Sequence, residues 1–166
     1  IILRIIIFKV NIFKINFFFD QVLPKFGENL DGTQNTITGT LEDIQHYIGE
    51  MYFLRASEYF KAYKKFGDSP KITGPLNDYT EENAEVSKRS PRNEVARFIL
   101  SDLDKAAALL EHKMMKTTRI NKDVALLLKS RVALFEGTWL KYFKGSAFVP
   151  QGTNWPGASK EYNANY

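Results

Sequence analysis

Apolar residues recur every three or four positions along most of this chain, which is the spacing of one face of an α-helix. The clearest stripe consists of Leu41, Ile44, Ile48, Met51, Tyr52, Ala56, Tyr59, Ala62 and Tyr63. Thr40 fits the N-cap of this helix, with Asp43 three residues later, and Gly67 and Pro70 supply a stop. The pattern predicts an amphipathic helix that runs to about Lys65 and buries most of its aromatic side chains.

Two further helices are predicted downstream. Ser90 fits an N-cap, with Pro91 at the first helical position. The stripe that follows comprises Val95, Phe98, Ile99, Leu103, Ala106, Leu109 and Leu110. Asn121 fits the cap of the last helix, which is expected to run to about Phe143 and to end at Gly145. Its stripe comprises Ala125, Leu128, Val132, Phe135 and Trp139, widened by Leu127 and Leu134.

The segments between these helices are rich in glycine, proline and polar residues, which is typical of loops. We expect loops over residues 24–40 and 67–90, the second with one helical turn near residues 79–83. The tail over residues 146–166 has neither helical nor strand periodicity. No segment shows convincing strand alternation. The sequence therefore predicts an all-α chain of antiparallel helix pairs with long irregular loops.

The first twenty residues are strongly apolar but carry Arg4, Lys9 and Lys14 at intervals. A secretory signal would have an uninterrupted apolar stretch and a small-residue cleavage site, and neither is found here. A membrane-spanning helix would hold two lysines and two asparagines near mid-bilayer, which is costly. A helix buried in the protein or covered by a partner is favoured, because its lysines and asparagines can leave the apolar face.

Composition narrows the functional classes. The 166 residues include no cysteine, which excludes disulfides, thiol catalysis and thiolate metal sites within them. The formal charge of +4 is mild, and acidic and basic residues are interspersed. Lys61, Lys64 and Lys65 form the nearest approach to a basic cluster and are interpreted as a solvated helix face rather than a nucleic-acid footprint.

An enzyme is not favoured. His46 and His112 have no partner at metal-ligand spacing, and we expect them to be inert residues on helix surfaces. The neighbouring acids Asp102 and Asp104, like other adjacent acids on these helices, are expected to be solvated. Glycoside hydrolysis needs two carboxyl groups facing each other across a sugar cleft, which sequence spacing does not establish. No phosphate-binding glycine loop or nucleophile elbow is present, and no cofactor or metal site is predicted.

Two glycines inside predicted helices, Gly49 and Gly137, are expected to mark close approach between helices. Tetratricopeptide units use glycines in this way, and their pattern includes Gly-x-x-Tyr and Ala-x-x-x-Phe. Residues 49–52 and 56–60 contain both fragments.

Three ordered blocks resemble the RagB/SusD family. They are GEMYFLRA at residues 49–56 with YF at 59–60 and FGDSP at 66–70; RSPRNEV at 89–95 with ILSDLDKA at 99–106; and RIN at 119–121 with ALLLKSRVALFEGTW at 125–139. NFFFD at residues 16–20 fits the helix that precedes them in the family. The resemblance covers about residues 16–145 and leaves residues 1–15 unplaced.

The resemblance implies a tetratricopeptide-like helical-repeat superhelix. SusD-like proteins are surface-exposed outer-membrane lipoproteins of Bacteroidetes that capture glycans without catalysis, as a lid on a TonB-dependent (SusC-like) transporter. Full members are several hundred residues long and begin with a lipoprotein signal that ends in cysteine. This sequence therefore resembles an internal fragment, with the lipid anchor outside it. The alternative is a helical-repeat scaffold that binds protein rather than sugar.

Residue chemistry alone supplies candidates for sugar contact. Trp155 lies in a Gly- and Pro-containing loop with Asn154 beside it, and Tyr162 and Tyr166 follow nearby. Aromatic rings can stack on sugar faces, and amides can exchange hydrogen bonds with hydroxyl groups. Trp139 lies on a helix stripe, so we expect core packing for it instead.

Overall fold

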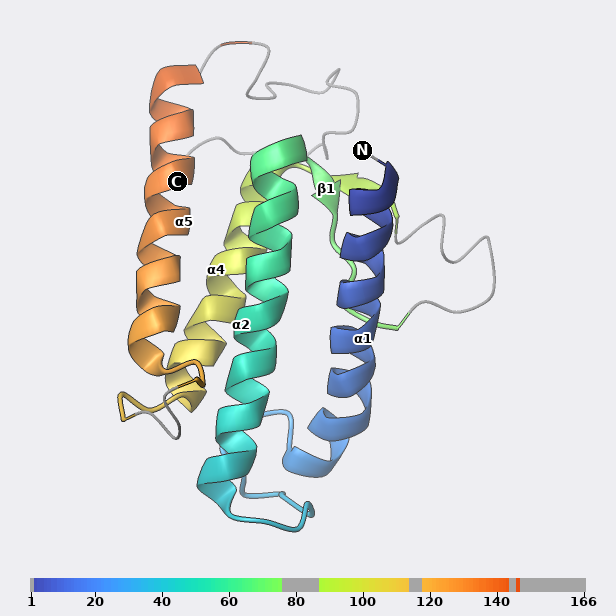
Figure 1. The fold of residues 1–166 in the computed structure, drawn as a ribbon, viewed down its shortest axis with the longest axis vertical. Coiled ribbons are helices and arrows are strands. Elements are labelled where there is room, and N and C mark those ends of the chain that lie inside the picture. Colours follow the sequence, from blue (N-terminus) through green and yellow to red (C-terminus); the bar gives the residue numbers. More distant parts are fainter. Residues whose placement is uncertain (1, 76–86, 114–117, 144–145, 147–166) are drawn as a thin grey trace.

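The computed structural model describes residues 2–75, 87–113, 118–143 and 146, and their side chains from residue 8 onward. Four long helices of this part of the chain lie side by side and alternate in direction (Figure 1). They are α1 (Ile2–Phe26), α2 (Leu41–Phe66), α4 (Arg92–Leu109) and α5 (Lys122–Phe143). The all-α prediction is confirmed for the described residues. The predicted turn near residues 79–83, the stop at Gly145 and the tail over residues 147–166 lie outside them.

One short ladder was not predicted. Strand β1 (Ser69–Pro70) pairs antiparallel with β2 (Arg89–Ser90), with Ser69 opposite Ser90 and Pro70 opposite Arg89. Two residues a side are too few to produce a detectable alternation of polar and apolar positions. The ladder holds the end of α2 near the start of α4.

Helix α1 packs one face against the bundle, as favoured for the apolar N-terminal segment. Its buried side chains are Ile12, Ile15, Asn16, Phe19 and Phe26, while Lys9 and Lys14 remain exposed. The expectation that asparagine leaves the apolar face is wrong for Asn16, which is only 1% exposed. None of the helices in the described part of the chain meets the length and hydropathy that crossing a membrane requires.

Helix α2 has the predicted extent, but its start differs in detail. Thr40 has the extended backbone of an N-cap, yet its hydroxyl donates to Asp43 Oδ2 at 2.6 Å and caps no backbone N–H. At the other end Gly67 adopts φ +66° and donates its N–H to Tyr63 O at 2.9 Å. The glycine stop is therefore confirmed.

Helix α4 begins one residue later than predicted. Pro91 is the N-cap, and Ser90 belongs to β2 instead. The N–H of Arg92, the first residue of the helix, donates to Asp68 Oδ1 from outside the helix at 2.9 Å. Asp68 follows the end of α2, so the same short segment terminates one helix and caps the next.

Helix α5 begins as predicted, since Asn121 Oδ1 accepts the N–H of Val124 at 3.1 Å. Its stripe is narrower than predicted. Ala125 and Val132 are buried, whereas Leu127 and Leu134 are 71% and 72% exposed. At about 100° per residue these two leucines lie on the far side of the helix from the buried stripe.

The two helix glycines, Gly49 and Gly137, differ in how closely a neighbouring helix approaches them. A Cβ built on Gly49 would lie 2.9 Å from Leu110 Cγ and 3.1 Å from Leu109 Cβ, so the predicted close approach is confirmed there. A Cβ on Gly137 would meet no described atom within 4 Å. The expectation of close approach is therefore wrong for Gly137, because this residue lies on the exposed side of α5.

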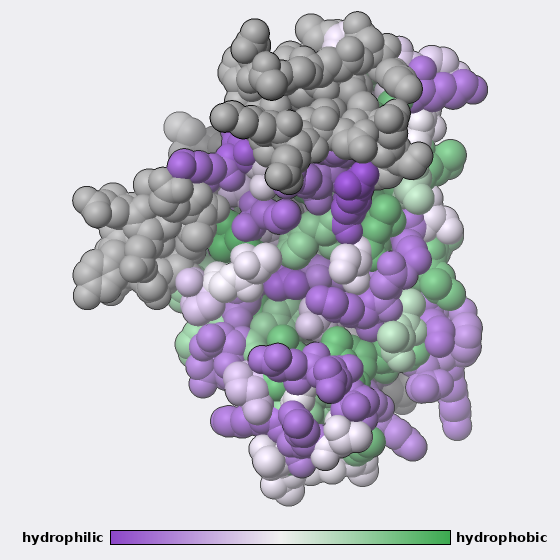
Figure 2. Space-filling view, turned by 180° about the vertical axis from the view of Figure 1, so that it is seen from behind, coloured by the Kyte–Doolittle hydropathy of each residue, from purple (hydrophilic) through white to green (hydrophobic). Residues whose placement is uncertain are grey.

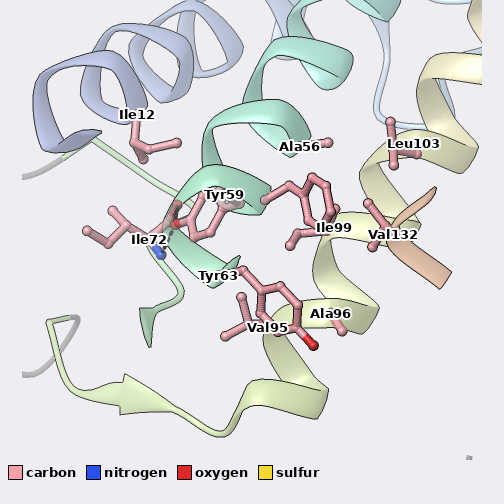
Figure 3. Packing of buried hydrophobic residues seen from close by; sticks show 11 residues of the cluster. Ile12, Ala56, Tyr59, Tyr63, Ile72, Val95, Ala96, Ile99, Leu103 and Val132 are labelled. Carbon is pink, nitrogen blue, oxygen red and sulfur yellow. Dashed lines mark hydrogen bonds between the residues drawn. The ribbon is translucent and has the colours of Figure 1, made fainter. Parts of the chain in front are cut away.

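The core is built mainly by α2 and α4. Figure 3 shows Tyr59 and Tyr63 of α2 packed among Val95, Ile99 and other buried residues, with Ile12 of α1 at one edge. The Tyr59 hydroxyl accepts the N–H of Ile72 at 2.7 Å and lies 3.1 Å from Ile72 O, to which it donates. A second cluster at the other end of the bundle includes Phe19, Ile48 and Leu110.

Candidate functional site

A buried arginine joins three helices at the centre of the bundle. Arg55 of α2 donates from Nε and Nη2 to the two carboxylate oxygens of Asp102 on α4, at 2.7 and 2.8 Å. Its Nη1 donates to Asn16 Oδ1 of α1 at 3.0 Å. Burial raises the pKa of the Asp102 carboxyl, and the hydrogen bonds and charge of Arg55 oppose that rise. Asp102 was expected to be solvated, and that expectation is wrong.

Aromatic rings enclose this charge. The guanidinium carbon of Arg55 lies 4.6 Å from the ring centroid of Phe19 and 5.0 Å from that of Phe98. Asn16 in turn donates to the carbonyl oxygens of Ile72 and Gly74, at 2.8 and 3.1 Å. The cluster therefore positions the segment after β1, and its role is structural.

A second buried arginine repeats the arrangement between α4 and α5. Arg92 donates from Nε and Nη2 to Glu136 Oε2 at 3.0 and 2.9 Å, and from Nη2 to the Tyr63 hydroxyl at 2.6 Å. Its guanidinium lies 4.2 Å from the ring centroid of Trp139. Trp139 is half-buried against this ion pair, as its position on the stripe predicted.

The two histidines have acidic neighbours. His46 is only 5% exposed, contrary to expectation, and its Nε2 lies 3.4 Å from Glu50 Oε1. Glu50 also pairs with Arg119 and accepts the N–H of Ile120 at 3.2 Å. His112 Nδ1 lies 2.7 Å from Asp123 Oδ1 on the surface. Among the described residues no three histidine, aspartate or glutamate side chains gather as metal ligands would.

A cleft lies between the first described turns of α1 and the last turns of α2, ends that lie side by side in Figure 1. It encloses about 370 Å³. The described residues that line it are Phe8, Asn11, Glu58, Lys61, Ala62, Lys65 and Phe66. It combines aromatic rings with an amide, a carboxylate and two ammonium groups, a mixture suited to a polar ligand that has some apolar surface.

A second hollow, of about 330 Å³, follows the C-terminal half of α5. Its described lining is largely aromatic or aliphatic and comprises Arg131, Leu134, Phe135, Thr138, Trp139, Tyr142 and Phe143. Hydrophobic atoms are visible along the right edge of Figure 2, where α5 runs. This apolar face is better suited to packing against another helix than to binding a ligand, because it offers few polar groups.

The residues predicted to contact sugar, Asn154, Trp155, Tyr162 and Tyr166, all lie outside the described residues. The lining of the α1–α2 cleft was not predicted. Its polar members belong to helix faces that read as solvated surface, and only the packing of α1 beside α2 brings them together.

The chain matches one protein family over residues 9–134, more than half of its length, and this family is described as SusD-like, starch-binding and associating with the outer membrane. SusD-like protein P2 of Formosa agariphila is 32% identical over 115 residues, which are 67% of this chain and 22% of that protein.

Solved structures agree with this assignment. A SusD-like protein of Bacteroides fragilis superposes with a TM-score of 0.64 at 30% identity, over 82% of this chain and 24% of that one. A laminarin-binding SusD-like protein shares the fold, with a TM-score of 0.60 at 20% identity over 89% of this chain and 30% of its own. The chain thus spans about a quarter of the length of these proteins, and it belongs to the SusD-like family.

Proposed function

We propose that this chain is part of a non-catalytic glycan-binding component of an outer-membrane nutrient-uptake system. The complete protein would be lipid-anchored at the cell surface and would deliver oligosaccharides to a TonB-dependent, SusC-like transporter. The observation that carries the proposal is the family match over residues 9–134, whose family is described as starch-binding and associating with the outer membrane.

Three of the described acidic side chains pair with arginines within the scaffold, which fits a binding role. Asp102 and Glu136 are buried and engaged by arginines, and Glu50 pairs with Arg119. A carboxyl group whose oxygens accept hydrogen bonds from a guanidinium is poorly placed to donate a proton to a leaving group.

Trp155, Asn154, Tyr162 and Tyr166 remain our proposed contacts for a neutral glycan, with Trp155 as the stacking platform. The test is native affinity electrophoresis of the chain in gels that contain starch-type or laminarin-type glucans. A Trp155→Ala variant is expected to lose most of its retardation. Phe17→Ala provides a matched control, because Phe17 is an aromatic residue that is 52% exposed on α1 and lines neither hollow.

If no polysaccharide in the gel slows the migration of the chain, glycan binding by this chain is contradicted. Equal loss in the two variants would contradict the role of Trp155 and leave glycan binding itself standing. A gene for a TonB-dependent transporter beside the gene for this chain would support the proposed partnership.

The alternative is a helical-repeat scaffold for protein partners. One observation favours it: Leu127, Leu134 and Tyr142 on the outer side of α5 are each more than 70% exposed, which is unusual for large apolar side chains. The same gels separate the two functions, because a pure protein scaffold would migrate identically with and without polysaccharide.

A further inference from the structure

The α1–α2 cleft has polar groups that other described residues leave wholly or partly without hydrogen-bond partners. Asn11 lies in its wall, half-buried, and its side-chain amide has no hydrogen-bond partner among the described residues. Glu58 Oε1 accepts a hydrogen bond from Lys61 Nζ at 2.6 Å, and no described group donates to the other carboxylate oxygen of Glu58. An uncommitted amide and a half-committed carboxylate can together exchange several hydrogen bonds with the hydroxyl groups of one sugar ring.

Two rings supply apolar surface to the same cleft. Phe66 ends α2 and is 38% exposed, so part of its ring is open to a ligand. Phe8 is held from behind, because its ring meets Tyr59 edge to face with centroids 5.3 Å apart and planes at 87°. A ring fixed as Phe8 is, beside polar groups, offers an apolar face without a further ordering cost for the ligand to overcome.

The charge of the cleft is unbalanced. Lys61 is paired with Glu58, whereas no described carboxylate lies within ion-pair distance of Lys65. Lys65 Nζ lies 5.3 Å from the ring centroid of Phe66, so this ammonium group lies beside the aromatic ring. With two ammonium groups and one carboxylate, the described lining carries one net positive charge and favours an anionic ligand.

We infer that this cleft is a saccharide subsite selective for an acidic sugar, whose carboxylate pairs with Lys65 while Asn11 and Glu58 bind its hydroxyl groups. The inference rests on the proposed glycan-binding function and assigns the subsite to residues distinct from the loop around Trp155. The volume of about 370 Å³ lies within the range of small-ligand sites and exceeds that of one sugar ring.

The test is isothermal titration calorimetry of the complete chain with trigalacturonic acid and with the neutral trisaccharide maltotriose. We expect the acidic trisaccharide to bind more tightly at low salt. Lys65→Gln should weaken its binding by about three- to tenfold, as loss of a partly exposed charge-assisted hydrogen bond does. Binding of maltotriose should change little.

Lys64→Gln is the matched control. Lys64 is the neighbouring exposed lysine, but its Nζ lies 4.8 Å from the ring centroid of Phe60 and it does not line the cleft. Equal weakening in the two variants, or no preference for the acidic trisaccharide, would overturn the inference. Binding of maltotriose alone would do so while leaving the proposed function intact. Binding of neither trisaccharide would also overturn the inference, and the affinity gels would then decide the proposed function.

Discussion

Arg55 and Asp102 join α2 to α4 through two parallel hydrogen bonds, from Nε to Oδ2 at 2.7 Å and from Nη2 to Oδ1 at 2.8 Å. Both side chains are nearly inaccessible, at 7% and 1% exposed. Arg92 and Glu136 join α4 to α5 in a similar way. Each successive contact between these helices thus contains one arginine enclosed by aromatic rings and paired with a carboxylate from the next helix.

Asp102→Ala is expected to lower the free energy of unfolding by about 3–5 kcal/mol, because it leaves the Arg55 charge buried and unpaired. Urea denaturation followed by circular dichroism measures the loss. Asp104→Ala is the control, since Asp104 is exposed on the same helix and its pair with Lys129 is a surface contact. That variant should change stability by less than about 1 kcal/mol. Similar losses in both variants would contradict a special role for the buried pair.

Gly49→Ala and Gly137→Ala should have effects of opposite sign. The new methyl group at position 49 would lie within 3.1 Å of Leu109 and Leu110 atoms close to the backbone, so we expect a loss of about 1–3 kcal/mol. At position 137 it meets no described atom, and alanine should stabilise the helix by up to about 1 kcal/mol. Thermal unfolding of both variants measures these two changes in stability. Stabilisation by alanine at position 49 would mean that α2 and α4 are not in close contact there.

Tyr59 should make stability fall above pH 10. Burial raises the pKa of Tyr59 from 10.0 to about 12, against the opposing hydrogen bond to Ile72. Between these values the unfolded chain has released the phenol proton while the folded chain retains it, so rising pH favours unfolding. The loss is roughly 2.3 kcal/mol at pH 12 and approaches roughly 2.7 kcal/mol above it.

Tyr59→Phe isolates this contribution. It should cost about 1–3 kcal/mol at pH 8, because the buried N–H of Ile72 loses its acceptor. The difference in unfolding free energy between the two proteins should then shrink as the pH rises from 9 to 11. A difference that stays constant across this range would show that the Tyr59 phenol does not titrate as its burial predicts.

The helices could be predicted from sequence because each depends on local information. The periodic stripes, Gly67 after α2 and the Asn121 cap define α2, α4 and α5 within a residue or two. The prediction failed where a polar residue lies on a buried face. Asn16 and Asp102 read as solvated positions, and only the packing of three helices brings Arg55 between them.

The cleft was beyond prediction for the same reason. Asn11 lies on α1, and Glu58, Lys65 and Phe66 lie on α2 more than forty positions later in the sequence. Of these four residues only Phe66 belongs to one of the blocks that carry the family resemblance, and that block gives no sign of a ligand. Leu127 and Leu134 show the opposite error. They were assigned to a buried stripe because they are apolar, although the helical period places them on the outside of α5.

The most direct test of glycan binding is a two-dimensional amide NMR titration of the complete chain with the oligosaccharide that binds best by calorimetry. Saturable shifts are expected for the residues that line the α1–α2 cleft with an acidic oligosaccharide, and for residues around Trp155 with a neutral one. Amides beside Arg55 and Arg92 should remain in place, because these pairs hold the scaffold rather than the ligand. A spectrum unchanged at millimolar concentrations of neutral and acidic oligosaccharides would contradict glycan binding by this chain.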